Sequence, residues 1–261
     1  MAEVKRKQMW SEHTGNPICI IEDDILQNGF YYNKYTGIFE GLVEGCVGDE
    51  KRVFCCTKKE GNKYLEPIQL NISNREFLIC SKIIAHESGT DGDECIYIAF
   101  TVRNRSRKIK KSIYALLMSG YSSVPKNEKT EMNPHTRNKK DLDARVGLIK
   151  ALLDEVDPTL GAEFWDGTDF LAWGNNHNKF KEYTKIKFST ELYEQYLKNQ
   201  KINQVYYGGK RYQIPHQIFR SSQNFNTEGF EYTTGIKKPP AEGELIGTKV
   251  AGKTIFWRIR R

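Results

Sequence analysis

Glu87 is the side chain whose type and position most favour chemistry. It follows the largely apolar segment 82–86 and precedes a glycine-containing break at 88–92. A carboxyl group at the C-terminal end of a buried helix feels the partial negative charge of the helix carbonyls and loses contact with water. Both effects favour its protonated form, which a general acid needs. The alternative interpretation is a solvated surface glutamate at the end of a helix.

Two amphipathic helices are predicted around this carboxylate. The first runs over about 75–87, with Ser73 or Asn74 as its cap, and carries apolar residues on a broad face. Asp93 can cap the second, over about 94–107, which has an apolar stripe at helical spacing. The stretch is therefore predicted to be a helical hairpin with an acidic residue at its turn.

The rest of the chain mixes strand and helix patterns. Residues 18–70 combine aromatic and β-branched runs with turns, which predicts a small antiparallel β region. Further helices are expected at 112–118 and 141–156, and further strands at 186–188, 205–212 and 254–259. Residues 216–250 are rich in Gly, Asn and Thr and are expected to be loop. The predicted class is α+β.

The composition indicates a folded, basic chain. It has 261 residues, of which 38% are hydrophobic and 12% aromatic, enough for a core. No apolar run approaches the roughly 18 to 20 residues that span a membrane, and no apolar signal segment is seen near the N-terminus. The net charge of +7 fits an ordinary soluble basic protein or attraction to a polyanion, either nucleic acid or cell wall.

The cysteine and histidine spacings argue against metal chemistry. None of the 6 cysteines has CxxC spacing, so buried thiols are expected. A disulfide is also compatible with the spacing of Cys19, Cys46, Cys55 and Cys56. His86 and Glu87 begin an HExxH pattern, but Thr90 stands where the second ligand belongs. A zinc peptidase, and a cysteine peptidase or amidase using Cys80 or Cys95, are retained as alternatives.

Residues 83–105 resemble the cell-wall hydrolases of the spore-cortex-lytic-enzyme type. Those enzymes carry a helix ending in an acidic residue, a Gly- and Glu-containing turn, and a helix ending in Val-x-Asn-Arg, which stands here at 102–105. Residues 120–124 look like the family's aromatic-Ser loop, and 151–165 are similar to its Ala-Leu … Asp-Pro-Thr-x-Gly-Ala element. The extension over 164–180 looks like a branch associated with Bacteroidetes.

The resemblance implies a lysozyme-like, mainly helical catalytic domain at 71–261, after an N-terminal β-rich delivery or accessory region at 1–70. It implies cleavage of the β-1,4 glycosidic bond of peptidoglycan, with Glu87 as general acid/base and no cofactor or metal. A lytic transglycosylase needs one carboxylate, whereas a muramidase more often needs a second. The candidate groove and second-carboxylate residues are Glu94, Tyr121, Ser122, Ser123, Asp166, Asp169 and His177.

The N-terminal region looks like pieces found ahead of toxin domains in secreted effectors. A protein made in the cytoplasm without a Sec signal would then act in the periplasm or cell wall of a target cell. An antibacterial effector, with an immunity protein or a secretion-apparatus component as partner, is ranked above a phage lysin. The non-enzymatic alternative is a nucleic-acid-binding module that uses the basic runs 103–111 and 137–140, but no recognition motif accompanies them.

Overall fold

The computed structural model describes most of the first part of the chain and the strands of the second. The described residues are 6–10, 17–21, 28–43, 52–89, 92–120, 124–167, 185–188, 204–207, 210–213, 230–233, 244–252 and 254–260. The chain divides into two compact units, Met1–Asp157 and Pro158–Arg261.

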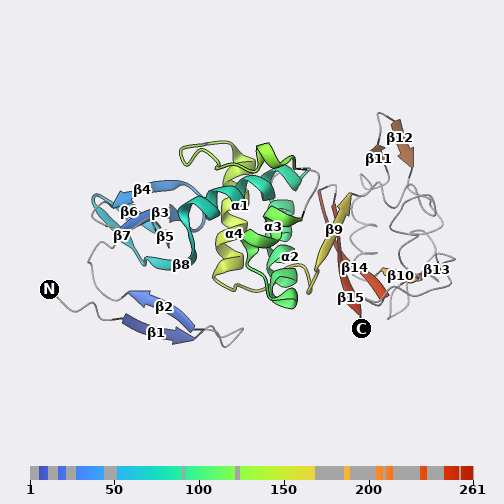
Figure 1. The fold of residues 1–261 in the computed structure, drawn as a ribbon, viewed down its shortest axis with the longest axis horizontal. Helices are drawn as coiled ribbons and strands as arrows, with labels where there is room; N and C mark the ends of the chain where they lie inside the picture. Colours follow the sequence, from blue (N-terminus) through green and yellow to red (C-terminus); the bar gives the residue numbers. More distant parts are fainter. Residues whose placement is uncertain are drawn as a thin grey trace. The chain divides into compact units, whose positions relative to one another are not determined.

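The first unit begins with a six-stranded sheet in the order β1-β2-β8-β5-β3-β4 (Figure 1). Its strands are β1 (Arg6–Trp10), β2 (Pro17–Ile21), β3 (Gly29–Asn33), β4 (Phe39–Val43), β5 (Arg52–Cys56) and β8 (Ile68–Ser73). Neighbouring strands are antiparallel except β3 and β5, which are parallel. A separate hairpin is formed by β6 (Lys58–Glu60) and β7 (Lys63–Leu65). The strands predicted within 18–70 are thus present.

Aromatic side chains of β3 form much of the core beside this sheet. The ring of Tyr31 stacks on Phe54 and on Tyr64, at centroid distances of 4.9 and 4.0 Å. Tyr32, the next residue, is fully buried and meets the ring of Phe77 at 4.8 Å. Its hydroxyl donates to the side-chain oxygen of Asn74 at 2.8 Å. Because Asn74 and Phe77 lie on the first helix, sheet and helix share one core.

Four α-helices and a short 3-10 helix follow in this unit. They are α1 (Asn74–Glu87), α2 (Asp93–Ile109), α3 (Ile113–Ser119), η1 (Lys126–Glu128) and α4 (Lys139–Leu152). The predicted hairpin of helices over about 75–107 is confirmed. The predicted cap Ser73 closes a capping box with Glu76, each accepting the other's backbone N–H, at 3.3 and 3.2 Å. Asp93 is not a cap, because Gly92 occupies that position of α2.

Helix α4 packs against both α1 and α2. Gly147 allows the approach to α2, since a Cβ atom there would lie 2.8 Å from the Cα of Ile96. Arg145 is completely buried on the same helix and donates to the carbonyls of Gly37, Pro134 and Asn133 at 3.2, 3.0 and 2.6 Å. The guanidinium of Arg145 therefore fastens the turn between β3 and β4 to α4.

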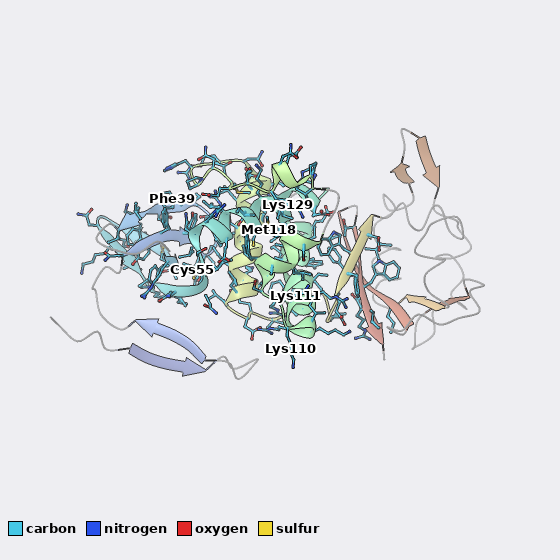
Figure 2. The ribbon with its side chains drawn as sticks, viewed as in Figure 1. Phe39, Cys55, Lys110, Lys111, Met118 and Lys129 are labelled. Carbon is cyan, nitrogen blue, oxygen red and sulfur yellow. The ribbon has the colours of Figure 1, made fainter. Side chains whose placement is uncertain are left out.

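Lys129 closes the C-terminal end of α3 (Figure 2). The side chain is buried, and its Nζ donates to the carbonyls of Leu117, Met118 and Gly120 at 3.0, 3.1 and 2.6 Å. The last carbonyls of a helix have no partner within the helix, and a cation there is also favoured by the helix dipole. The ammonium group of Lys129 therefore supplies a partner for the carbonyls at the end of α3, including that of Gly120.

The second unit contains a five-stranded sheet in the order β13-β10-β14-β15-β9, and a separate hairpin of β11 and β12. Its strands are β9 (Phe164–Gly167), β10 (Lys185–Phe188), β11 (Gln204–Tyr207), β12 (Lys210–Gln213), β13 (Phe230–Thr233), β14 (Glu244–Ala251) and β15 (Thr254–Arg260). Ile255, Phe256 and Trp257 are fully buried in β15. The strands predicted at 186–188, 205–212 and 254–259 are present, whereas the loop predicted over 216–250 contains β13 and most of β14.

The mixed α+β class is confirmed, because the chain contains both helices and sheets. The lysozyme-like arrangement, and the division by role into 1–70 and 71–261, stay predictions. Within the described residues, no helix is long and apolar enough to cross a membrane.

Candidate active site

Glu87 is the last residue of α1 and its side chain is half-buried. Ala85 and Ser88 on either side are buried, while His86 is exposed. The N–H of Ser88 donates to the carbonyl of Ile84 at 3.1 Å and ends the helix. The carboxylate therefore stands where the sequence predicts it, at the C-terminal end of a helix with a buried face.

Glu94 lies on the other side of the same turn. Only 1% of its surface is exposed, and its Oε1 accepts a hydrogen bond from the N–H of Gly89 at 3.1 Å. It is the second residue of α2, in the first turn of that helix. The structure thus brings Glu94 to the turn that follows Glu87.

Helix α4 holds the far end of this turn. The N–H of Gly92 donates to Oδ2 of Asp143 at 2.7 Å, and the same carboxylate oxygen pairs with Nζ of Lys139 at 2.6 Å. Gly92 has φ +73° and ψ −131°, a conformation that favours glycine. Asp143 was not among the residues predicted for the site. A weak signal for it is its place four residues after Lys139, on a predicted helix.

Cys95 of α2 contacts the turn between α1 and α2 through Ser88. Its Sγ donates to the carbonyl of Lys140 at 3.7 Å. Burial raises the pKa of its thiol to about 11, and a hydrogen bond with Ser88 partly opposes that rise. Burial likewise raises the pKa of Cys55 and Cys56 to about 12 and that of Cys80 further.

These four cysteines are free and buried. The prediction of buried thiols is confirmed for them, and neither Cys55 nor Cys56 is in a disulfide. A thiol held protonated near neutral pH is a poor nucleophile, so these four side chains offer little to a cysteine peptidase.

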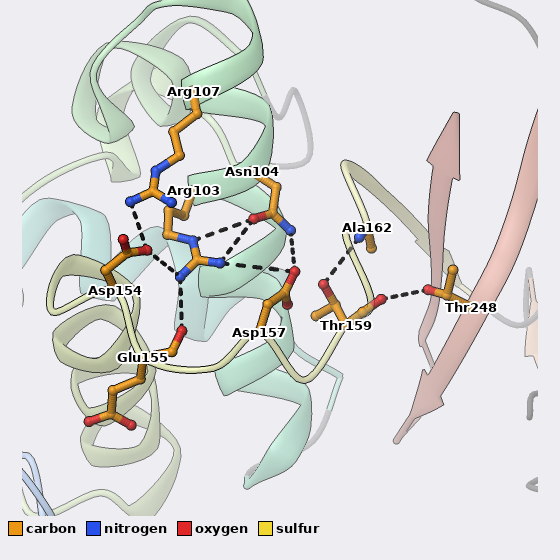
Figure 3. Close-up of polar contacts among 9 residues, drawn as sticks. All are labelled: Arg103, Asn104, Arg107, Asp154, Glu155, Asp157, Thr159, Ala162 and Thr248. Atoms are coloured by element: carbon orange, nitrogen blue, oxygen red, sulfur yellow. Dashed lines mark hydrogen bonds and ion pairs between the residues drawn. The ribbon is translucent and has the colours of Figure 1, made fainter. Parts of the chain in front are cut away.

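The Val-x-Asn-Arg signature, at 102–105 in the second half of α2, makes polar contacts with the segment that follows α4 (Figure 3). Nη1 of Arg103 donates to Oδ1 of Asp154 at 3.0 Å and to the carbonyl of Glu155 at 3.1 Å. Nδ2 of Asn104 donates to Oδ2 of Asp157 at 2.8 Å. These contacts tie α2 to the segment after α4, so Asn104 joins a helix to a loop.

The Asp-Pro-Thr-x-Gly-Ala element continues as a tight turn (Figure 3). Oγ1 of Thr159 accepts the N–H of Ala162 at 3.2 Å, and the carbonyl of Thr159 accepts the hydroxyl of Thr248 at 2.8 Å. Leu160 and Gly161 between them have φ values of +58° and +82°. The contacts of Thr159 are those of a structural turn.

The basic run 103–111 contains both buried and exposed side chains. Arg103 is buried, and Arg107 pairs with Oδ1 of Asp154 at 2.7 Å. Lys110 and Lys111 are exposed beyond the end of α2 (Figure 2). A polyanion would therefore meet fewer of these cations than the sequence alone indicates.

The other predicted site residues are only partly placed. Asp166 lies half-buried in β9 of the second unit, opposite Ile255 of β15. The remaining candidates fall outside the described residues, namely Tyr121, Ser122, Ser123, Asp169 and His177. In the part of the chain that the structure describes, no group of three or more His, Cys, Asp or Glu side chains is placed to hold a metal ion.

Comparisons with known proteins give no relative for this chain. No protein-family model matches it. No curated protein matches it, and no solved structure does.

Proposed function

We propose that this protein cleaves the glycan strands of peptidoglycan, with Glu87 as the general acid/base. The observation that carries the proposal is the position of Glu87, half-buried at the C-terminal end of α1 beside a turn that α2 and α4 both hold. A general acid/base needs a carboxyl group in a defined position, and a half-buried group beside a held turn has one. The sequence resemblance to cell-wall hydrolases supports the choice of substrate.

In the proposed reaction, Glu87 first gives its proton to the oxygen of the β-1,4 glycosidic bond as that bond breaks. The resulting carboxylate then removes a proton, either from the muramic 6-hydroxyl, which closes an anhydro ring, or from water. The buried carboxylate of Glu94, bonded to the backbone of Gly89, is poorly placed to meet water or sugar. We favour a mechanism with a single carboxylate, that of a lytic transglycosylase, over a muramidase, for which Asp166 and Asp169 stay the candidates for a second carboxylate.

The proposed catalytic body is the helical group α1 to α4, taken as a lysozyme-like core. The biological setting belongs to the same proposal: an antibacterial effector, or else a phage lysin, that acts on the wall of a target cell. An effector of this kind would have an immunity protein or a secretion-apparatus component as a partner.

Digestion of purified peptidoglycan, with the products read by mass spectrometry, tests the proposal. Anhydro-muramic ends are expected for a transglycosylase, and reducing muramic ends for a muramidase. Glu87→Gln should abolish cleavage with an unchanged circular dichroism spectrum. The matched control is Glu128→Gln, at an exposed glutamate of η1, which should remain active. Cut peptides with intact glycan, or a fully active Glu87→Gln variant, would contradict the proposal.

A further inference from the structure

We propose that Glu94 is a positioning residue, whose buried carboxylate fixes the backbone just after Glu87 and thereby the direction of the Glu87 side chain. This inference rests on the proposed function, because it concerns the same carboxyl group. It assigns Glu94 a part in the reaction that involves no contact with substrate.

The backbone beyond Glu87 has two successive hydrogen bonds of different origin. The N–H of Ser88 is bonded within α1, to the carbonyl of Ile84. The N–H of Gly89 is bonded to Oε1 of Glu94, from the first turn of the next helix. Glycine has the widest backbone freedom of any residue type, so the conformation of Gly89 depends on its contacts. Without the second bond, the backbone after Ser88 would lose this tie to α2, and the end of α1, where Glu87 is the last residue, would be held less firmly.

The surroundings of Glu94 suit a fixed carboxylate. Its side chain is 1% exposed, and it lies in the first turn of α2. A hydrogen bond that is out of contact with water is stronger than the same bond in water. Glu94 and Asp143 thus hold the two described ends of the turn, at Gly89 and Gly92.

Two substitutions separate this role from general support of the fold. Glu94→Gln keeps a side-chain oxygen that can accept the Gly89 N–H, whereas Glu94→Ala removes the acceptor. The comparison variant is Glu76→Ala, which breaks the capping box at the opposite end of α1 and leaves the turn intact. All three are assayed on soluble glycan chains for kcat and KM, with thermal unfolding measured in parallel.

Glu94→Ala should lower kcat by about tenfold to a hundredfold with little change in KM, because small misplacements of a catalytic group are costly. Glu94→Gln should restore most of the lost kcat, and Glu76→Ala should lower the melting temperature while kcat stays near wild type. Hydrogen exchange should be faster at the Gly89 amide in Glu94→Ala than in Glu94→Gln.

Two outcomes separate this inference from the proposed function. An active wild type with unchanged kcat in Glu94→Ala, or an equal loss of kcat in Glu76→Ala, would overturn the positioning role alone. A wild-type protein that leaves glycan uncut would overturn both.

Discussion

Asp143 of α4 bonds the residue at which α2 begins: its Oδ2 accepts the N–H of Gly92 at 2.7 Å, across 51 positions of sequence. Gly92 is the N-cap residue of α2 and has no side chain that could accept the N–H groups of the first helical turn. The Asp143 carboxylate accepts the N–H of the N-cap residue itself, which in a capping box is the part of the glutamate at the third helical position. One contact thus joins α2 to α4 and fixes the end of the turn after Glu87.

We expect Asp143→Ala to lower the free energy of unfolding by about 1 to 2 kcal/mol, because the Gly92 N–H loses its acceptor. Asp143→Asn should lose less, since its amide oxygen can still accept. Lys139→Ala, which removes only the exposed partner of Asp143, should cost about 0.5 kcal/mol or less. Urea unfolding followed by circular dichroism measures all three. Equal losses of unfolding free energy in Asp143→Ala and Lys139→Ala would show that the hydrogen bond from Gly92 to Asp143 contributes nothing.

Asp154 makes the most buried ion pair described in the first unit, and its removal should be severe. Its side chain is 6% exposed and meets Arg103 at 3.0 Å and Arg107 at 2.7 Å. Asp154→Ala removes the nearer of the two carboxylates that pair with the buried guanidinium of Arg103 and leaves only Asp157, at 4.0 Å, which should cost about 3 kcal/mol. Asp154→Asn should lose less, because asparagine accepts a hydrogen bond and tolerates the φ of +62° at this position.

The control for Asp154 is Arg107→Ala, at the more exposed partner, whose side chain is 47% exposed. Its loss should be about 1 kcal/mol or less. Chemical unfolding of the three variants compares them, and an Asp154→Ala protein as stable as Arg107→Ala would refute the assigned role.

The helices were the part of the fold that the sequence could predict. Apolar residues at a spacing of three and four place α1, α2 and α4 within a few residues of their observed bounds. The last of these ends at Leu152 and not near 156, because Asp154 has a left-handed conformation, with φ +62°, that an α-helix cannot continue. The periodicity of a helix is local, so it needs no knowledge of the partner.

Strands β13 and β14 could not be predicted in this way. The stretch that contains them carries Gly, Thr and charged residues. Both strands pair with β10, which is distant in sequence, and β14 also pairs with β15, which follows it after a turn. Such pairing is decided by tertiary context more than by propensity. The extension over 164–180 begins with β9, which likewise gains its strand structure by pairing with β15.

The sequence could predict Glu87 at the end of a helix, but it could not predict the long-range contacts around that residue. A carboxylate at a helix end is visible in sequence, and so is the break after it. The contacts of Asp143 with Gly92, and of Arg145 with Gly37, join segments 51 and 108 positions apart. Nothing in local patterning signals a backbone carbonyl or N–H as the partner of a distant charged side chain.

Lys129 should be essential to the end of α3. Lys129→Met keeps much of the apolar stem but leaves the carbonyls of Leu117, Met118 and Gly120 without the ammonium that they share. We expect a loss of about 1 to 3 kcal/mol in the free energy of unfolding, measured by urea titration. Lys82→Met, which removes an exposed bond to Thr130, is the matched control and should be nearly neutral. Equal stability of the two variants would exclude the capping role.

Cys95 should make the protein less stable in alkali. Burial raises the pKa of its thiol from 9.0 to about 11, so between these values the native state keeps a proton that the unfolded state has lost. Folding then binds a proton, and the free energy of unfolding falls as the pH rises from about 9 to about 11. Below about 9 this contribution is fully present, and above about 11 its loss is complete.

Cys95→Ser tests this directly, because serine keeps a hydroxyl donor for the Lys140 carbonyl but does not titrate in this range. Urea unfolding in a reducing agent, at pH 8, 9, 10 and 11, should show a shallower decline for the variant than for wild type. The slope difference isolates Cys95, because Cys55 and Cys56 contribute equally to both proteins. In a parallel measurement at pH 8, iodoacetamide should label Cys95 in urea and spare it in the native protein. Parallel pH curves, or native labelling as fast as in urea, would contradict the assignment of a buried, protonated thiol.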